Sequence, residues 1–303
     1  MFKQEFRYIE EEIDNKGFVV IDMIPEEEIS ILRESAFKII NQIDSNLISD
    51  KFLSTGRLES AKIRNESSKQ VNDKIGHHIN NYFIASEVEI VSAGYLLKGK
   101  GAESTLNPHQ DSSLIDERKY RSYFIWIPLQ DTNHINGTIN VIPGSHKLEI
   151  YQRSLNIPWN LEGYSKLLWK FMIPINVKTG QALFFHSALI HGSTPNLSDN
   201  LRIATNFFIR NRESQYTHYY SDSDSNYKNI ELYNVTPEFY FSYNILKRPP
   251  ENFPLIRTEM NINRQYSIKE LWNALRVERK KYYKNKLSLK FQIPYIYYLY
   301  NYI

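Results

Sequence analysis

Two histidines and one aspartate in this chain have the types and spacing of a metal site. His109 and Asp111 lie two residues apart in segment 107–111 (NPHQD), and His191 lies in segment 189–193 (LIHGS). Two imidazoles and one carboxylate make the facial triad that holds non-haem Fe(II) and leaves coordination positions open for chemistry. Residues i and i+2 of a β-strand point to the same face, so we expect His109 and Asp111 to reach one metal from one strand end. His191 is predicted to supply the third ligand from elsewhere in the fold.

Arg202 is the second candidate for chemistry. It lies eleven residues after His191, inside the largely apolar segment 200–207 (NLRIATNF). Apolar neighbours on both sides predict a strand with the arginine pointing inward. Because a buried guanidinium without a counter-charge is costly, Arg202 needs an anion, either from a structural salt bridge or from a bound ligand.

Other histidines compete with His191 for the metal. His186 lies in a Phe-Phe-His sequence five residues before His191, and we expect it in the core or behind the ligands. His146 is a further competitor. His134 and His218 have no motif around them and are expected at the surface.

The elements that must position these residues are mostly short strands. Turn signals such as Asn136-Gly137 and Thr179-Gly180 separate apolar, β-branched segments. Many short strands with turn punctuation are typical of a sandwich or a barrel. Strands are predicted at residues 17–22, 88–98, 121–130, 138–142, 172–177, 181–186 and 202–210. Helices are predicted at residues 25–44, 70–85 and 267–288.

Several segments follow one another in a fixed order along the chain. They are 17–22 (GFVVID), 25–28 (PEEE), 108–111 (PHQD), 124–129 (FIWIPL), 136–147 (NGTINVIPGSHK) and 184–193 (FFHSALIHGS), with Asn196 and Arg202. An HxD pair alone is weak evidence, whereas HxD, PGSH and HGS segments followed by an arginine are specific in this order. Together these segments resemble the phytanoyl-CoA dioxygenase family, over roughly residues 15–210.

The resemblance implies a mainly β protein with flanking helices. Its core would be a double-stranded β-helix, the cupin-like jelly roll. The metal would be Fe(II), with 2-oxoglutarate and O2 as cosubstrates. His109, Asp111 and His191 would be the metal ligands and the catalytic centre, and His146 would stay off the metal.

The resemblance also implies cofactor-binding residues. Arg202 would bind the distal carboxylate of 2-oxoglutarate through a planar, bidentate pairing, and Ser193 would donate a second hydrogen bond to it. Trp126 would form a wall of the cosubstrate pocket, or else pack in the core. Thr138 is expected to line the same pocket.

The implied activity is that of a non-haem Fe(II)- and 2-oxoglutarate-dependent dioxygenase. It would hydroxylate an unactivated C–H bond of a small-molecule, lipid or glycan metabolite and release succinate and CO2. Desaturation, cyclisation and epimerisation are alternatives within the same chemistry. A non-catalytic jelly-roll protein that binds a ligand is the alternative of a different class, because fold does not fix function. Arg118, Lys119 and Arg121 form either a basic patch for an acyl-CoA or an ordinary solvated loop.

Composition narrows the partners and the compartment. The 303 residues carry a formal net charge of +3 and no cysteine. A charge so balanced argues against nucleic acid as a partner, and the lack of cysteine excludes disulfides and thiolate metal sites. No segment has the apolar length of a signal peptide or a membrane-spanning helix. We therefore expect a cytoplasmic protein.

The chain is expected to form one dioxygenase domain over residues 1–265. Its core motifs fall in 88–210, with a helical insertion near 148–171 that would pack on the barrel, close over the substrate, or do both. Residues 266–303 form a basic helix and a Tyr-rich tail. The tail would pack on the barrel or on a second subunit, and peripheral contact with an anionic membrane surface is the alternative.

Overall fold

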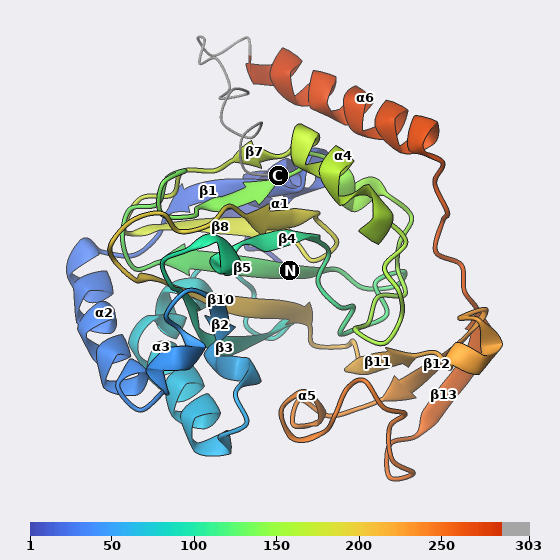
Figure 1. The fold of residues 1–303 in the computed structure, drawn as a ribbon, viewed down its shortest axis with the longest axis horizontal. Coiled ribbons are helices and arrows are strands. Elements are labelled where there is room, and N and C mark those ends of the chain that lie inside the picture. Colours follow the sequence, from blue (N-terminus) through green and yellow to red (C-terminus); the bar gives the residue numbers. More distant parts are fainter. Residues whose placement is uncertain (287–303) are drawn as a thin grey trace.

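A sandwich of two antiparallel sheets forms the centre of the computed structural model, which describes residues 1–286 (Figure 1). The larger sheet contains, in spatial order, β1 (Phe18–Asp22), β8 (Gln181–His186), β5 (Ser122–Pro128), β10 (Arg202–Asn211), β3 (Val88–Lys98) and β2 (Phe52–Ser54). The smaller sheet contains β4 (Leu106–His109), β9 (His191–Ser193), β6 (Ile139–Val141) and β7 (Ile173–Pro174). The predicted jelly-roll core is confirmed.

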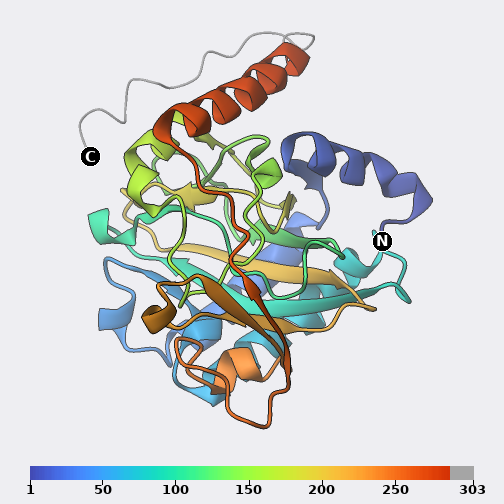
Figure 2. The same cartoon turned by 90° about the vertical axis from the view of Figure 1, so that its right-hand side faces the viewer.

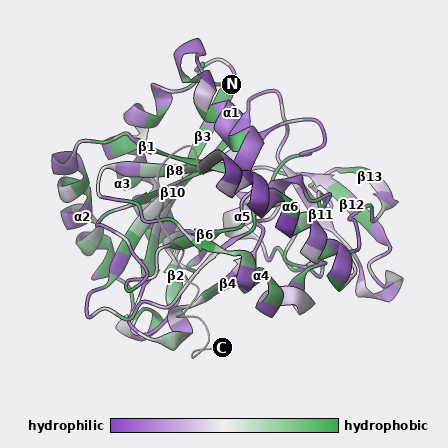
Figure 3. Ribbon diagram, turned by 90° about the horizontal axis from the view of Figure 1, so that it is seen from above, coloured by the Kyte–Doolittle hydropathy of each residue, from purple (hydrophilic) through white to green (hydrophobic). Residues whose placement is uncertain are grey.

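Helices cover the outer face of the larger sheet. Ile13, Leu32 and Ile75, one from each of the first three helices, belong to one buried hydrophobic cluster with Ile125 of β5 and Phe207 of β10. These helices are α1 (Arg7–Lys16), α2 (Glu26–Ile40) and α3 (Ala61–Asn80). Figure 3 shows the green, hydrophobic strands behind helices of mixed colour, as expected for amphipathic helices packed on a sheet.

Alternation along β10 decides which side chains face the inside of the jelly roll. Ile203 and Phe207 pack against the helices, whereas Ala204 and Phe208 pack between the two sheets. Because successive side chains of a strand point to opposite faces, Arg202 lies on the interior face with Ala204 and Phe208. The inward orientation predicted for Arg202 thus follows from the alternation of side chains along β10.

A third, three-stranded sheet lies beside the sandwich and was not predicted. It consists of β11 (Thr217–Tyr220), β12 (Asn229–Asn234) and β13 (Leu255–Met260), with the short helix α5 (Phe239–Ser242) between the last two strands. Its strands are short and rich in Asn, Glu and Tyr, and β13 is largely exposed. The apolar alternation that marks a strand is confined to Ile230 and Leu232 of β12, which are buried.

Three helical predictions differ from the structure at their bounds. The helix predicted at 25–44 ends earlier, at Ile40. The predicted helix 70–85 begins earlier, at Ala61, because Ser60 caps it through the backbone N–H of Ile63 at 3.4 Å. The insertion 148–171 is helical only toward its end, in α4 (Ser165–Phe171) after a short 3-10 turn.

Helix α6 (Ile268–Lys286) begins after Ser267 as expected and packs across α4 (Figures 1 and 2). Ser267 and Glu270 form a reciprocal capping box at its start. Within residues 1–286, no helix has both the length and the apolar character needed to cross a membrane. The predicted Tyr-rich tail, 291–303, lies outside the described residues.

Candidate active site

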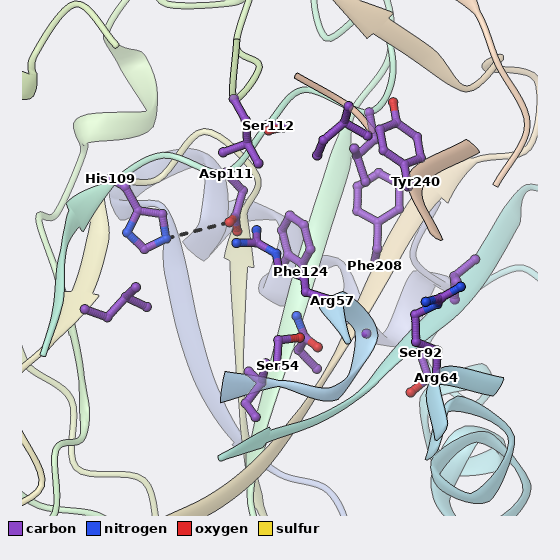
Figure 4. Close-up of a pocket in the computed structure, with 18 of the residues that line it drawn as sticks. Ser54, Arg57, Arg64, Ser92, His109, Asp111, Ser112, Phe124, Phe208 and Tyr240 are labelled. Atoms are coloured by element: carbon purple, nitrogen blue, oxygen red, sulfur yellow. Dashed lines mark ion pairs between the residues drawn. The ribbon is translucent and has the colours of Figure 1, made fainter. Parts of the chain in front are cut away.

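The three predicted metal ligands meet where β4 and β9 pair in the smaller sheet. His109 ends β4 and is the direct cross-strand partner of His191 on β9, with ring centroids 4.3 Å apart. Asp111 follows the strand end, and its two carboxylate oxygens lie 3.7 Å from His109 Nε2 and 3.7 Å from His191 Nε2. One potential ligand atom from each residue lies within 4.8 Å of the others. Figure 4 shows His109 and Asp111 turned toward each other.

Backbone carbonyls orient both imidazoles. The Nδ1–H of His109 donates to the Asn107 carbonyl at 2.8 Å, and the Nδ1–H of His191 donates to the Leu189 carbonyl at 3.0 Å. Each Nε2 lone pair is then free for a metal. Burial, followed by the neighbouring His191, lowers the pKa of His109 to about 4, so this ring is neutral, as a metal ligand must be, at neutral pH.

A buried ion pair behind Asp111 was missed by the sequence analysis. The Nε of Arg153 donates to the Asp111 backbone carbonyl at 2.7 Å, and its Nη2 lies 2.8 Å from Glu117 Oε1. Both side chains are 3% exposed. Arg153 holds the chain at Asp111 and comes from the insertion, which therefore supports the site, whereas Glu117 precedes the insertion and holds Arg153 in place.

Arg202 is buried without a counter-charge. It is 2% exposed, its Nε and Nη1 have no hydrogen-bond partner, and no acid among residues 1–286 forms an ion pair with it. Burial lowers its pKa to about 9. The buried hydroxyl of Ser193 also has no partner. Within residues 1–286, Arg202 therefore forms no structural salt bridge. Its unpaired donors are suited to a bound carboxylate.

One cavity of about 1000 Å³ joins these groups. Its lining includes the three ligands, Ser193, Trp126 and Arg202, and the Trp126 ring lies 5.6 Å from the Arg202 guanidinium carbon. Ser154 and Leu155 of the insertion also line it. The structure does not bring Thr138 to this cavity, because its hydroxyl is held by Thr132 Oγ1 at 3.0 Å and by the Ile175 carbonyl.

The other histidines lie apart from the ligand cluster. His186 and His146 pack together, with centroids 5.2 Å apart, and neither belongs to the cluster. His134 is exposed, as expected. The surface prediction for His218 was wrong: this residue is 3% exposed, lies on β11 and lines the cavity. The error follows from the missed third sheet.

The basic segment after the HxD motif does not form a free patch. Arg118 pairs with Asp116 and Glu259 at 3.0 Å. Arg121 pairs with Glu10 at 3.2 Å and with Asp14 at 2.9 Å. These acids neutralise the arginines that an acyl-CoA phosphate would need.

One cavity of this jelly roll holds two histidines, an aspartate and a buried arginine. Fold and site together are those of the non-haem 2-oxoglutarate oxygenases. The family model "Phytanoyl-CoA dioxygenase (PhyH)" matches residues 14–204. The chain belongs to this family.

Relatives agree with this assignment. The Arabidopsis thaliana protein "Phytanoyl-CoA dioxygenase" is 24% identical over 64% of this chain and 85% of its own length. The Danio rerio "Phytanoyl-CoA dioxygenase domain-containing protein 1" is 29% identical over 41% of this chain and 46% of its own length. The chain thus spans less than half of that relative.

Two solved structures share the fold at low sequence identity. The "Non-heme monooxygenase, ThoJ-Ni complex" has a TM-score of 0.51 at 16% identity, covering 91% of this chain and 98% of its own. EvdO2 from Micromonospora carbonacea var. aurantiaca, complexed with 2-oxoglutarate, has a TM-score of 0.50 at 15% identity, covering 70% and 93%.

Proposed function

We propose that this protein is a non-haem Fe(II)- and 2-oxoglutarate-dependent dioxygenase that acts on a small-molecule, lipid or glycan substrate. The observation that carries the proposal is the buried, unpaired Arg202 in the same cavity as the His109, Asp111 and His191 cluster. A protein that bound only a metal would not need this arginine. Membership of the phytanoyl-CoA dioxygenase family supports the same activity.

The chain's residues divide the work of binding. His109, Asp111 and His191 would hold the metal, and the carboxylate of Asp111 would neutralise part of its charge. Arg202 and Ser193 would hold the distal carboxylate of 2-oxoglutarate deep in the cavity, with Trp126 as a wall. When bound, the iron would activate O2, the oxidant, with 2-oxoglutarate as co-reductant: one oxygen atom would enter succinate as CO2 leaves, and the other would oxidise the substrate C–H bond.

The cavity walls protect this chemistry from water. Phe124, Phe185 and Phe208 line it between the two sheets, and apolar walls strengthen every charged contact inside. The backbone carbonyls on both Nδ1 atoms hold the imidazoles in one orientation. The protein's contribution is therefore to bind, to orient and to keep the site dry.

The test is an anaerobic titration of the purified chain with Fe(II) and 2-oxoglutarate, followed by visible absorption. A weak metal-to-ligand charge-transfer band is expected, because a keto acid would chelate iron held by the triad. No band in a folded sample would contradict the proposal and favour the non-catalytic ligand-binding alternative.

Hydroxylation is the proposed outcome among the oxidations open to this chemistry. Succinate release in a metabolite screen would identify substrates, and product mass would assign the reaction. A gain of one oxygen is expected, whereas a loss of two hydrogens would indicate desaturation or ring closure instead.

We also propose peripheral membrane contact through α6. Lys170, Arg276 and Lys280 line a groove between α4 and α6 with the exposed ring of Trp272, and no acid lines this groove. Such a surface suits anionic lipid. The full chain should float with vesicles containing anionic lipid and not with neutral ones, and R276E/K280E should lose flotation. If the chain floats with neither kind of vesicle, the result would contradict membrane contact. It would favour packing of α6 against the barrel or a second subunit, in a protein that is free in the cytoplasm.

A further inference from the structure

Arg57 is a cation in the cavity that the mechanism above does not use. It ends the short 3-10 turn Thr55–Arg57, is exposed, and lines the cavity. Figure 4 shows its guanidinium reaching from that turn toward Asp111. Among residues 1–286, no acid forms an ion pair with Arg57.

The turn that carries Arg57 is firmly anchored. Thr55 Oγ1 donates to Ser67 Oγ on α3 at 2.9 Å and accepts from the Tyr95 backbone N–H of β3 at 2.8 Å. On the other side, Arg64 Nη1 donates to the backbone carbonyls of the two residues that follow Arg57, at 2.8 Å for Glu59. Arg57 is therefore presented from a fixed support, as a specific contact requires.

The charges of the cavity leave an anion to be supplied. Its lining cations are Arg57, Arg64 and Arg202, and its lining acids are Asp111 and Glu59. A dication, the 2-oxoglutarate dianion, Asp111 and Arg202 together sum to zero. Arg57 and Arg64 then face Glu59 alone, which leaves one positive charge. An excess positive charge in the same cavity as a bound dication is unfavourable, and an incoming anion would offset it.

We propose that Arg57 binds an anionic group of the substrate, a carboxylate or a phosphate, and so places a neighbouring C–H bond beside the triad. The proposal rests on the proposed function and names the substrate class for the same site. Arg64 acts as a positioning residue, through the carbonyls that it holds. The preferred substrate is a small organic acid or phosphate ester.

The position of Arg57 favours the substrate over 2-oxoglutarate as its ligand. Arg202 is 2% exposed and lies at the deep end, where the cosubstrate would sit. Arg57 is exposed and lines the same cavity, so a second molecule could reach it from solvent. Two arginines at different depths suit two different anions.

The experiment measures anion binding to the full chain by calorimetry, with benzoate, phenyl phosphate and uncharged benzamide as probes. It is run on the protein alone and on protein saturated with redox-inert Ni(II) and 2-oxoglutarate, so that Arg202 is occupied. The variants are Arg57→Gln and Arg57→Lys. Arg7→Gln is the matched control, because Arg7 is exposed on α1 outside the cavity.

In the loaded protein, one of the two anions should bind about tenfold more tightly than benzamide, as a charge-assisted hydrogen bond at a partly exposed site allows. The tighter anion identifies the group. Arg57→Gln should abolish the preference, Arg57→Lys should keep part of it, and Arg7→Gln should keep all of it.

Three results would overturn the assignment. The first is that the wild type shows no preference for an anion, and the second is that Arg57→Gln keeps the wild-type preference. The third is that the probe competes with 2-oxoglutarate and Arg57→Gln weakens the binding of 2-oxoglutarate. If Ni(II) and 2-oxoglutarate fail to bind at all, the proposed function fails. The measurement on the protein alone then still decides whether Arg57 binds an anion.

Discussion

Each histidine of the proposed triad uses Nδ1 for a hydrogen bond to a backbone carbonyl, which would leave Nε2 for the metal. His109→Ala, Asp111→Ala or His191→Ala should therefore weaken Fe(II) binding by more than about 100-fold, since even loss of a supporting partner costs 10–100-fold. His186→Ala should leave the affinity unchanged, because His186 packs on His146 instead. Anaerobic metal titration checks this. Loss of metal in His186→Ala with retention in His191→Ala would reverse the assignment.

Lys98 makes the stability of the chain depend on pH. Burial, followed by Arg202, lowers its pKa to about 6 from 10.5. Between these values the folded state holds fewer protons on Lys98 than the unfolded chain, so this residue makes the free energy of unfolding rise with pH. Its destabilising effect is full below about pH 6 and disappears near pH 10.5.

Lys98→Met should flatten that rise between pH 6.5 and 8.5, as measured by urea unfolding. The variant also removes donors from the Ser104 and Thr194 carbonyls, a loss that does not depend on pH. Lys62→Met, on the exposed face of α3, is the control. Equal slopes for wild type and Lys98→Met would contradict the shift.

Residues whose signal is local were predicted from the sequence, and those whose partners are distant were not. The two residues of the HxD motif lie two positions apart, and the apolar neighbours of Arg202 lie within a few positions of it. Arg153 meets Glu117 only because the insertion folds back over the site. No motif in the sequence near Arg153 or near Glu117 predicts that these two residues form an ion pair.

At the scale of elements, the pairing of β4 with β9 positions both histidines. A Cβ on Gly192 would lie 2.6 Å from the Leu106 carbonyl oxygen of the neighbouring strand, so Gly192→Ala must push the strands apart. We expect a loss of about 1–3 kcal/mol in stability and weaker metal binding with every ligand still present. Thermal unfolding and metal titration check both effects.

Gly163→Ala is the matched control for this change. A Cβ at Gly163 meets nothing within 4 Å, so the same substitution there should leave both quantities unchanged. If Gly192→Ala also leaves them unchanged, the close approach of β4 and β9 does not govern the site.

Elements were predicted where apolar periodicity was strong. The bounds of β3 match the prediction, 88–98, and β8 matches 181–186, because both strands are buried and apolar. The β11–β13 sheet was missed because its strands are short and β13 is largely exposed, so the apolar signal in each strand is brief. That omission also hid His218, which a strand brings into the cavity.

For the whole molecule, ligand binding should appear as stability. A metal with 2-oxoglutarate at about 100 times the dissociation constant adds roughly 2.7 kcal/mol, or about 4 °C in the melting temperature of a chain of 303 residues. Ni(II) plus 2-oxoglutarate should raise the melting temperature by this order, in differential scanning fluorimetry. Arg202→Gln should respond to Ni(II) and no longer to 2-oxoglutarate. An equal response in both proteins would remove Arg202 from the cosubstrate site.

The pairing of His109 with His191 also sets a time for acquiring iron. A ribosome adds about 5–20 residues per second, so the second histidine emerges several seconds after the first. A nascent chain holding only His109 and Asp111 has a weak, two-ligand hold on any ion. The complete set of three ligands would therefore form only once β9 has emerged and paired with β4, and a shorter nascent chain would hold a metal ion weakly.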